Sequence, residues 1–315
     1  MNTLGDSFTF TGFGESHGPA VGGVLDGVPA GVPIDLDAIR EALDRRAGRQ
    51  GHEGLTAGVS PRAVNESDQV EWLSGVMDGV SLGTPIAFLI RNTNTHPEDY
   101  ARFKDSFRSG HADYTYARKY GIRDYRGGGR ASARETAARV VAGTIAAQLL
   151  RLRGITIHAE LCQVGVETDP TRWSELLQQV RQANDSVGGI VTCSAKGLPV
   201  GLGEPVFDKL QSHLSYAMLS INGCKGFEYG TGFDMRPRGS ELYKEVPCPA
   251  SGGIEGGISN GLELAFRCAF KPAASVQIGG RHDACIAVRA VPVVEAMTAL
   301  VIQNFIQQFN KNKKR

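Results

Sequence analysis

The chain has 315 residues, 41% of them hydrophobic, which is enough to bury a sizeable core. Its 34 lysines and arginines nearly balance 33 aspartates and glutamates, so no global field favours nucleic acid or an anionic membrane. The six cysteines form no CxxC pair, so neither a disulfide framework nor a zinc site is indicated. The chain begins without the basic and apolar segments of a signal peptide, and no stretch approaches about 18 apolar residues. We expect a soluble cytoplasmic protein with no metal.

Short β-like runs and helical runs follow one another without a regular βαβ repeat, which favours an α+β fold. No linker-like change of composition divides the chain, so a single domain spanning residues 1–315 is expected. The predicted strands are residues 7–13, 21–25, 85–91, 189–195, 225–233 and 285–291. The predicted helices are residues 35–46, 132–153, 205–219 and 292–309, the last two with proline in the first turn.

One glycine run leads directly into a predicted helix. From residue 127 the chain reads GGGRASARET, in which Ser132 and Glu135 have the spacing of a capping box. Glycines let backbone amides approach a ligand, the helix start adds partial positive charge, and Arg130 and Arg134 add full charges. The sequence therefore predicts a site for a phosphate or carboxylate at this junction.

Two histidines lie beside glycines and are acid–base candidates. They are His17 in GESHG and His111 in RSGHADY, and a third titratable candidate is Asp283 in GRHDAC. Either histidine alone could equally be structural, but together they suggest an acid–base pair. Fingerprints of dinucleotide-binding folds, P-loops and zincins are absent from the sequence.

Six segments occur in a characteristic order: GESHG, RSGHADYT continuing to GGGRASARET, SINGCKG, GGIEGGISNG, KPAAS and GRHDACIAVRAVPVVEAM. In this order, and over nearly its whole length, the chain resembles the chorismate synthase family. The resemblance implies a lyase that converts 5-enolpyruvylshikimate 3-phosphate to chorismate and phosphate by anti-1,4-elimination with reduced FMN, the last common step of the shikimate pathway to aromatic amino acids. It also implies a β-α-β sandwich with helices between antiparallel sheets, assembled as a homotetramer.

The resemblance further implies roles for individual residues. His17 would keep the leaving phosphate protonated, His111 would set the protonation of the reduced flavin, and Asp283 would assist proton removal near the flavin N5. Substrate contacts fall on Arg46, Arg134 and Arg289, with Arg49 competing for the place of Arg46 because DRRAGRQ departs from the family pattern. The implied flavin contacts are Arg130, Ala131, Ser132, Asn222, Gly223, Gly256, Lys271, Pro272, Ala273, Ala274, Ser275 and Arg281.

The chain is short where the family has loops over the flavin pocket, at residues 232–253 and 275–281. Without such loops, water would be excluded less completely from a reduced flavin. Two alternatives to the plain lyase therefore stay open. One is added reduction of the flavin by NADPH, and the other is a non-catalytic FMN- or anion-binding protein, against which the retention of His17, His111 and Asp283 argues.

Overall fold

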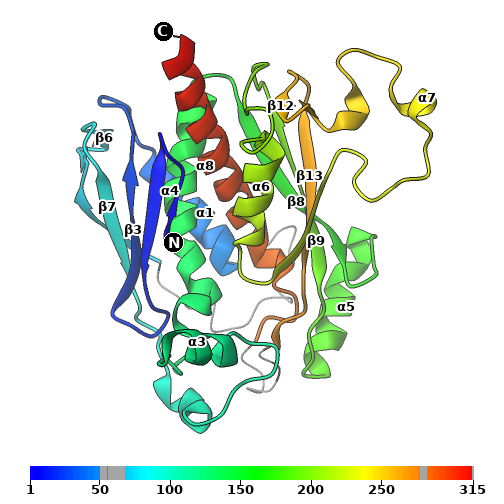
Figure 1. Cartoon of the computed structure of the whole chain (residues 1–315). Coiled ribbons are helices and arrows are strands. Elements are labelled where there is room, and N and C mark those ends of the chain that lie inside the picture. The colour runs from blue at the N-terminus through cyan, green and yellow to red at the C-terminus, as the bar shows by residue number, and fades with distance from the viewer. Residues whose placement is uncertain (50–54, 56–67, 275, 277–281, 314–315) are drawn as a thin grey trace.

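Two antiparallel sheets enclose a layer of helices in the computed structural model, which describes residues 1–49, 55, 68–274, 276 and 282–313 (Figure 1). The first sheet has the strand order β1-β2-β3-β7-β4 and the second the order β10-β13-β9-β8. The strands of the first sheet are β1 (Thr3–Leu4), β2 (Thr9–Gly14), β3 (Ala20–Asp26), β4 (Val70–Ser74) and β7 (Ile86–Arg91). Those of the second are β8 (Thr156–Val164), β9 (Gly189–Lys196), β10 (Cys224–Tyr229) and β13 (Leu264–Phe270). The α+β sandwich expected from the sequence is confirmed.

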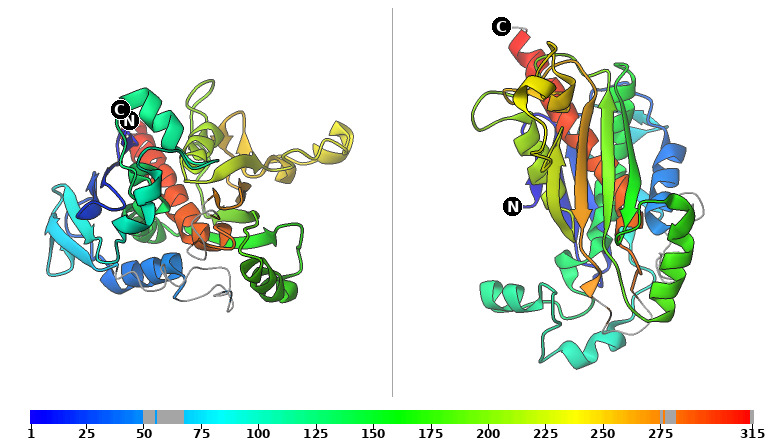
Figure 2. Two further views of the ribbon diagram at one scale, coloured as in Figure 1. Left: turned by 90° about the horizontal axis from the view of Figure 1, so that it is seen from below. Right: turned by 90° about the vertical axis from the view of Figure 1, so that its right-hand side faces the viewer.

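Four helices fill the space between the sheets: α1 (Leu36–Ala47), α4 (Thr136–Arg151), α6 (Leu210–Leu219) and α8 (Ala287–Lys313). Helix α4 packs on β3 of the first sheet, α8 packs on β8 and β9 of the second, and the two helices pack on each other. Seen from the side, the second sheet lies in front of α8 (Figure 2). This arrangement brings the first turns of α4 and α8 to the same end of the molecule (Figure 1).

The remaining elements are short or lie outside the sandwich. The segment that carries α7 projects away from the body on the side of the second sheet (Figures 1 and 2). The further helices are η2 (Pro97–Phe103), α3 (Asp113–Tyr120), η3 (Gly129–Ala131), η4 (Ala133–Glu135), α5 (Pro170–Gln182), α7 (Gly239–Leu242) and η5 (Pro249–Ser251). The further strands are β5 (Val76–Met77), β6 (Val80–Ser81), β11 (Ile254–Glu255) and β12 (Ile258–Ser259).

Alternating sequence produces strands with one face in the core. Along β9 buried residues alternate with half-buried ones, so that Val191, Cys193 and Ala195 all face the helices. Helix α1 starts where expected, because Asp35 accepts a hydrogen bond from the Ala38 backbone N–H (2.9 Å) and so caps it.

Several predicted elements were wrong in extent or type, including the helix predicted over residues 132–153, which is observed over Thr136–Arg151. Residues 285–291, predicted as a strand, include the first turn of α8, so Pro292 lies inside that helix rather than at its start. The helix expected from residue 205 begins only at Leu210. The strand expected to reach residue 233 ends at Tyr229, where the chain turns.

Helix α8 is long and apolar enough to cross a membrane by composition alone. Within the part of the chain that the structure describes, it is the one helix for which this holds, over Ala287–Lys311. However, 89% of its most apolar window is buried inside the protein. Its composition is therefore that of a core helix covered by two sheets.

Gly143 lets α4 and α8 approach closely. A Cβ atom at this position would overlap the backbone and side chain of Ala296 on α8. We expect Gly143→Ala to lower the free energy of unfolding by about 1–3 kcal/mol because of this overpacking, although alanine favours a helix intrinsically. Urea unfolding checks this against Thr144→Ala, the neighbouring change on the same helix. A midpoint for Gly143→Ala at or above that of the unmodified protein would contradict the packing argument.

Candidate active site

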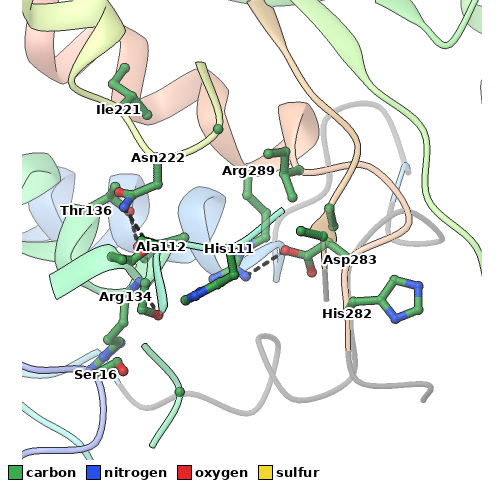
Figure 3. Close-up of a pocket in the computed structure, with 18 of the residues that line it drawn as sticks. Ser16, His111, Ala112, Arg134, Thr136, Ile221, Asn222, His282, Asp283 and Arg289 are labelled. Atoms are coloured by element: carbon green, nitrogen blue, oxygen red, sulfur yellow. Dashed lines mark hydrogen bonds and ion pairs between the residues drawn. The ribbon is translucent and has the colours of Figure 1, made fainter. Parts of the chain in front are cut away.

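A cavity of about 570 Å³ opens at the end of the sandwich where α4 and α8 begin (Figure 3). Its walls come from the loop after β2, the segment before α3, the start of α4, the turn between α6 and β10, and the residues that lead into α8. The volume lies within the range of about 300–1,000 Å³ that is usual for small-molecule sites. Because the first turns of α4 and α8 both contribute to the walls, the partial positive charges of two helix N-termini favour an anionic ligand in this cavity.

Among the described residues, four arginines line the cavity, Arg46, Arg108, Arg134 and Arg289, and a buried aspartate binds two of them. The Asp68 carboxylate, whose side chain is fully buried, accepts hydrogen bonds from Arg46 Nη1 (3.2 Å) and Arg134 Nη1. Arg46 also donates from Nε to Thr136 Oγ1 (3.0 Å) and from Nη2 to the Ala133 carbonyl (3.0 Å), at the start of α4. These bonds fix the planes of both guanidinium groups.

Charge keeps Asp68 ionised despite its burial. Burial alone would raise the pKa of Asp68, but Arg46, Arg134 and Arg289 together outweigh it and hold the pKa below its ordinary value. Two carboxylates, Asp68 and Asp283, are outnumbered by the guanidinium groups of Arg46, Arg134 and Arg289, so this wall of the cavity has a net positive charge. Such a wall suits a ligand with several negative charges.

Asp283 and Arg289 form an ion pair at the start of α8. Arg289 Nη1 donates to Asp283 Oδ2 (3.1 Å), and Arg289 Nε donates to the backbone carbonyl of Arg46 (2.8 Å). Figure 3 marks this ion pair with a dashed line and shows the ring of His282 pointing away from it. Accordingly, His282 Nε2 contacts the Asp185 carbonyl (3.0 Å) outside the group of candidate residues.

His17 lies in the wall of the same cavity. Its Nδ1 is 3.2 Å from Ser16 Oγ, and its ring meets that of Tyr100 edge to face with 5.0 Å between centroids. Gly127 packs directly on the His17 ring, where any Cβ atom would clash with Nδ1 and Cε1. His17 is therefore held on three sides and buried, as a proton donor in a dry site would be.

His111 is held by a different set of contacts. Its Nδ1 is 2.9 Å from Asp113 Oδ1 and 3.1 Å from Arg108 Nη2. A Cβ atom on Gly128 would come within 2.5 Å of Cε1 and 2.9 Å of Nε2. The glycine run predicted to cradle a ligand thus packs against the two histidines, with positive φ angles of 64° and 93° at Gly127 and Gly128.

Burial lowers the pKa of His111, and the neighbouring Arg108 lowers it further, against a smaller opposing effect of Asp113. His111 is therefore neutral around neutral pH. A neutral imidazole carries one free lone pair, so it can accept a proton.

Most of the predicted flavin contacts line this cavity. Asn222 Nδ2 donates to the Ala131 carbonyl (2.9 Å), while the buried Asn222 Oδ1 accepts no hydrogen bond from the described residues. An acceptor left in this state fits a ligand with its own N–H donors, and apolar Ile221, Ile286 and Val293 fit a flat ring. The predicted contacts in the lining are Ala131, Ser132, Asn222, Gly223, Lys271, Ala273 and Ala274. The residues present therefore fit a flavin.

Other predicted contacts lie elsewhere. Arg130 does not line the cavity and instead contacts Asn2 Oδ1 (3.2 Å) and the Gly14 carbonyl (3.5 Å). Gly256 is in the turn between β11 and β12, at the end of the sandwich far from α3 (Figure 1), and Pro272 is outside the lining. Ser275 and Arg281 lie outside the described residues.

Arg49, the alternative to Arg46, is bound to another partner. Its guanidinium contacts Asp44 Oδ1, in the last turn of α1, at 2.6 Å, whereas Arg46 lines the cavity. This placement favours Arg46 of the two.

The capping box predicted for Ser132 and Glu135 was wrong. Ser132 Oγ accepts from the Arg134 backbone N–H (3.3 Å), and the Glu135 carboxylate accepts from Arg139 Nε (3.0 Å) instead of returning to Ser132. The chain makes two short 3-10 turns, η3 and η4, before α4 begins at Thr136. These turns leave room for Arg46 to bond the Ala133 carbonyl.

Besides Arg108 and Asp113, which bond to His111, sequence reasoning missed four more residues of the site. They are Asp68, Asn92, Tyr100 and Lys225, all of which line the cavity or bond to residues that do. Asn92 Oδ1 accepts from Arg134 Nε at 2.9 Å. Lys225 stands in SINGCKG, so its motif was a usable signal, whereas Asp68 stands in a polar stretch without any motif.

The fold and the cavity together define an enzyme that binds a small polyanion beside acid–base groups. A family model described as chorismate synthase matches residues 8–279. The chain is 46% identical to a chorismate synthase of Phocaeicola vulgatus and 45% identical to one of Christiangramia forsetii, covering 97% and 99% of both chains, respectively. A solved structure entitled "Crystal Structure of Chorismate Synthase" is similar with a TM-score of 0.75 and 28% identity, over 96% of this chain and 93% of that one.

The chain belongs to the chorismate synthase family. Its activity is that of a lyase that converts 5-enolpyruvylshikimate 3-phosphate to chorismate in the shikimate pathway, and the family requires reduced FMN. The alignment with the first relative extends over 355 residues although this chain has 315, so the relative has residues that this chain lacks.

Proposed function

We propose that the cavity at the start of α4 and α8 is where this elimination takes place, with the substrate's negative charges against Arg46, Arg134 and Arg289. The observation that supports this most is the convergence of two histidines, Asp283 and three guanidinium groups from distant parts of the sequence on one cavity. In such a site the cations stabilise the charge that develops on the departing phosphate.

His17 and Asp283 assist the two bond-breaking events of the elimination, one at the phosphate and one at the ring proton. The carbon–oxygen bond to phosphate breaks, a proton leaves another ring carbon, and a second ring double bond forms. His17, buried beside Ser16 and Tyr100, donates a proton to the leaving phosphate, and Asp283 assists the removal of the ring proton. The ion pair with Arg289 keeps the Asp283 carboxylate at the cavity wall.

Reduced FMN, when bound, supplies electron density to the substrate during the elimination and is not consumed. The residues that would hold it are Asn222, Ala131, Lys271 and Ala274. His111 would set the protonation state of the reduced flavin. Lys271 lines the cavity and its Nζ donates to the Gly110 carbonyl (2.7 Å), which links the flavin wall to the segment that carries His111.

We also propose that the enzyme is a single-domain homotetramer of the cytoplasm, as the family resemblance implies. Sedimentation velocity at micromolar concentration measures the assembly, and a species of monomer mass would contradict it. Flavin reduction by NADPH stays a prediction; bleaching of the oxidised FMN band on anaerobic addition of NADPH tests it.

Phosphate release is the direct test of the activity. We expect the purified protein to release phosphate and chorismate from 5-enolpyruvylshikimate 3-phosphate when FMN is photoreduced under anaerobic conditions without NADPH. The same mixture with oxidised FMN serves as the control. Bound FMN without phosphate release would instead support the non-catalytic binding protein.

A further inference from the structure

The segment that carries His111 is organised around a single carboxylate. Asp113 is the first residue of α3, and its side chain is only 2% exposed. It accepts from the Arg108 backbone N–H (3.1 Å), from Arg108 Nε (2.8 Å) and from Arg108 Nη2 (2.8 Å). Its Oδ1 is also the atom 2.9 Å from His111 Nδ1. One buried carboxylate thus binds both an arginine and a candidate catalytic histidine.

Asp113 is ionised at any pH at which the enzyme works. Burial would raise the pKa of its carboxyl, but hydrogen bonds from Arg108 outweigh burial and lower the pKa to about 2. An ionised carboxylate has no proton to donate, and a guanidinium has no lone pair to accept with. Of the two neighbours of His111 Nδ1, Asp113 can therefore only accept a hydrogen bond and Arg108 can only donate one.

These neighbours decide which ring nitrogen carries the proton. If Nδ1 held a lone pair, that lone pair would lie 2.9 Å from a carboxylate oxygen and would repel it, and its only donor among the described residues would be the more distant Arg108 Nη2 (3.1 Å), which already donates to the Asp113 carboxylate. If Nδ1 holds the proton, it donates to Asp113 Oδ1, and Arg108 keeps its own bonds to the same carboxylate. A histidine's tautomer is set by such a partner. Nε2 has no hydrogen-bond partner within the described part of the chain.

We propose that Asp113 is a positioning residue that holds His111 as the Nδ1–H tautomer and so leaves the Nε2 lone pair as the proton acceptor of the cavity. This inference rests on the proposed function for the role of His111 in turnover. Arg108 completes the unit, because it fixes the Asp113 carboxylate in one orientation while its guanidinium lies over the ring of Tyr100 (5.5 Å). The same logic operates when an aspartate orients the histidine of a Ser-His-Asp triad.

The charged groups around His111 come from several segments. Arg108 and Asp113 stand on its own segment, Lys271 approaches from the strand side through Gly110, and Arg123 Nη1 lies 3.8 Å from Asp113 Oδ1. Burial and the two cations Arg108 and Lys271 lower the pKa of His111 and outweigh the Asp113 carboxylate, so the neutral ring is favoured. The tautomer held by Asp113 therefore decides what this neutral ring can do.

Asp113→Asn tests the tautomer without reference to activity. Arg108 makes two of its three bonds to Oδ2 and one to Oδ1, so the amide oxygen of the new side chain should take the place of Oδ2. The amide NH₂ group then takes the place of Oδ1 and faces Nδ1, and His111 should change to the Nε2–H tautomer. Long-range ¹H–¹⁵N correlation spectra of ¹⁵N-histidine-labelled protein report which nitrogen is protonated, and the His111 signal is assigned by its absence in His111→Ala. An Nε2–H signal in the unmodified protein, or no change in Asp113→Asn, would overturn the proposal.

Turnover gives the second measurement. We expect Asp113→Asn to lower kcat by roughly 10²–10³-fold, because the lone pair needed at Nε2 is lost. Asp113→Glu keeps a carboxylate and should recover a large part of the rate. The double variant His111→Ala/Asp113→Asn should be no slower than His111→Ala alone, since both changes remove one function. Independent, multiplying losses would show a merely structural role and refute the proposal.

A matched control is available on the surface. Asp234 accepts from the Arg236 backbone N–H (3.2 Å), from Nε (2.7 Å) and from Nη2 (2.7 Å), the same pattern that Asp113 makes with Arg108, but without a histidine. Asp234→Asn should leave kcat and every histidine signal unchanged. If His111→Ala itself turns over normally, the proposed role of His111 fails, while the spectra still decide whether Asp113 sets its tautomer.

Discussion

His111→Ala is expected to lower turnover by roughly 10²–10⁴-fold while the protein stays folded and still binds FMN. The change removes a neutral imidazole at the cavity wall. It leaves no buried charge unpaired, because Asp113 keeps its bonds from Arg108. Anaerobic single-turnover measurement of phosphate release, together with quenching of flavin fluorescence on binding, separates the rate from the affinity.

His158→Ala is the control for this change. His158 stands on β8 with 68% of its side chain exposed, so its loss should alter neither rate nor binding. The reverse result, with unaltered turnover in His111→Ala, would remove His111 from the mechanism. Loss of flavin binding without loss of rate at saturating FMN would make it a binding residue only.

Asp68→Ala is expected to destabilise the protein by about 3–5 kcal/mol, the usual cost of removing one partner from a buried ion pair. Arg46 and Arg134 would be left with guanidinium nitrogens that face each other without the carboxylate between them. Asp68→Asn keeps the shape and should also destabilise, because the charge is lost. Urea unfolding at neutral pH measures both changes.

The effect of pH on this contribution follows from the direction of the pKa shift. Because the pKa of Asp68 in the folded protein is below its ordinary 3.8, its ionisation contributes stability fully above that value. This contribution is lost as the pH falls through the lowered folded-state pKa. The difference between Asp68→Asn and the unmodified protein should therefore shrink in strongly acidic buffer.

Glu71→Gln is the matched control for Asp68. Glu71 also binds an arginine, Arg91, through two bonds of 2.9 and 3.0 Å, but both side chains are about half exposed. An exposed pair of this kind contributes little to stability. Equal shifts of the urea midpoint in Glu71→Gln and Asp68→Asn would contradict the role assigned to burial.

The sequence predicted those parts of the fold that have a strong local pattern. β7 and β9 alternate buried and half-buried positions, and α1 has an aspartate cap, so both types of element were recognised. Residues 285–291 were misread because a short apolar run suits a buried strand as well as the start of a buried helix, and Pro292 suggested a helix start that lies earlier. The two possibilities, a buried strand and the start of a buried helix, are distinguished only by how the segment packs between the two sheets.

Residues of the candidate site that stand in recognisable motifs were predicted from the sequence, whereas a residue outside any motif, such as Asp68, was missed. His111, Asn222 and Arg289 stand in recognisable segments, and all three line the cavity. Asp68 becomes significant only because folding brings it between Arg46 and Arg134, which the sequence does not show. Its neighbours in the sequence belong to no motif.

The contacts of Gly127 and Gly128 have a consequence for how the two imidazoles are spaced. The histidines belong to segments far apart in the sequence, yet consecutive peptide units touch both rings. One short stretch of backbone therefore limits how closely the two imidazoles proposed to transfer protons can approach each other, in addition to the contacts that hold each ring in its own segment. A displacement of that stretch would change the packing of both rings at once.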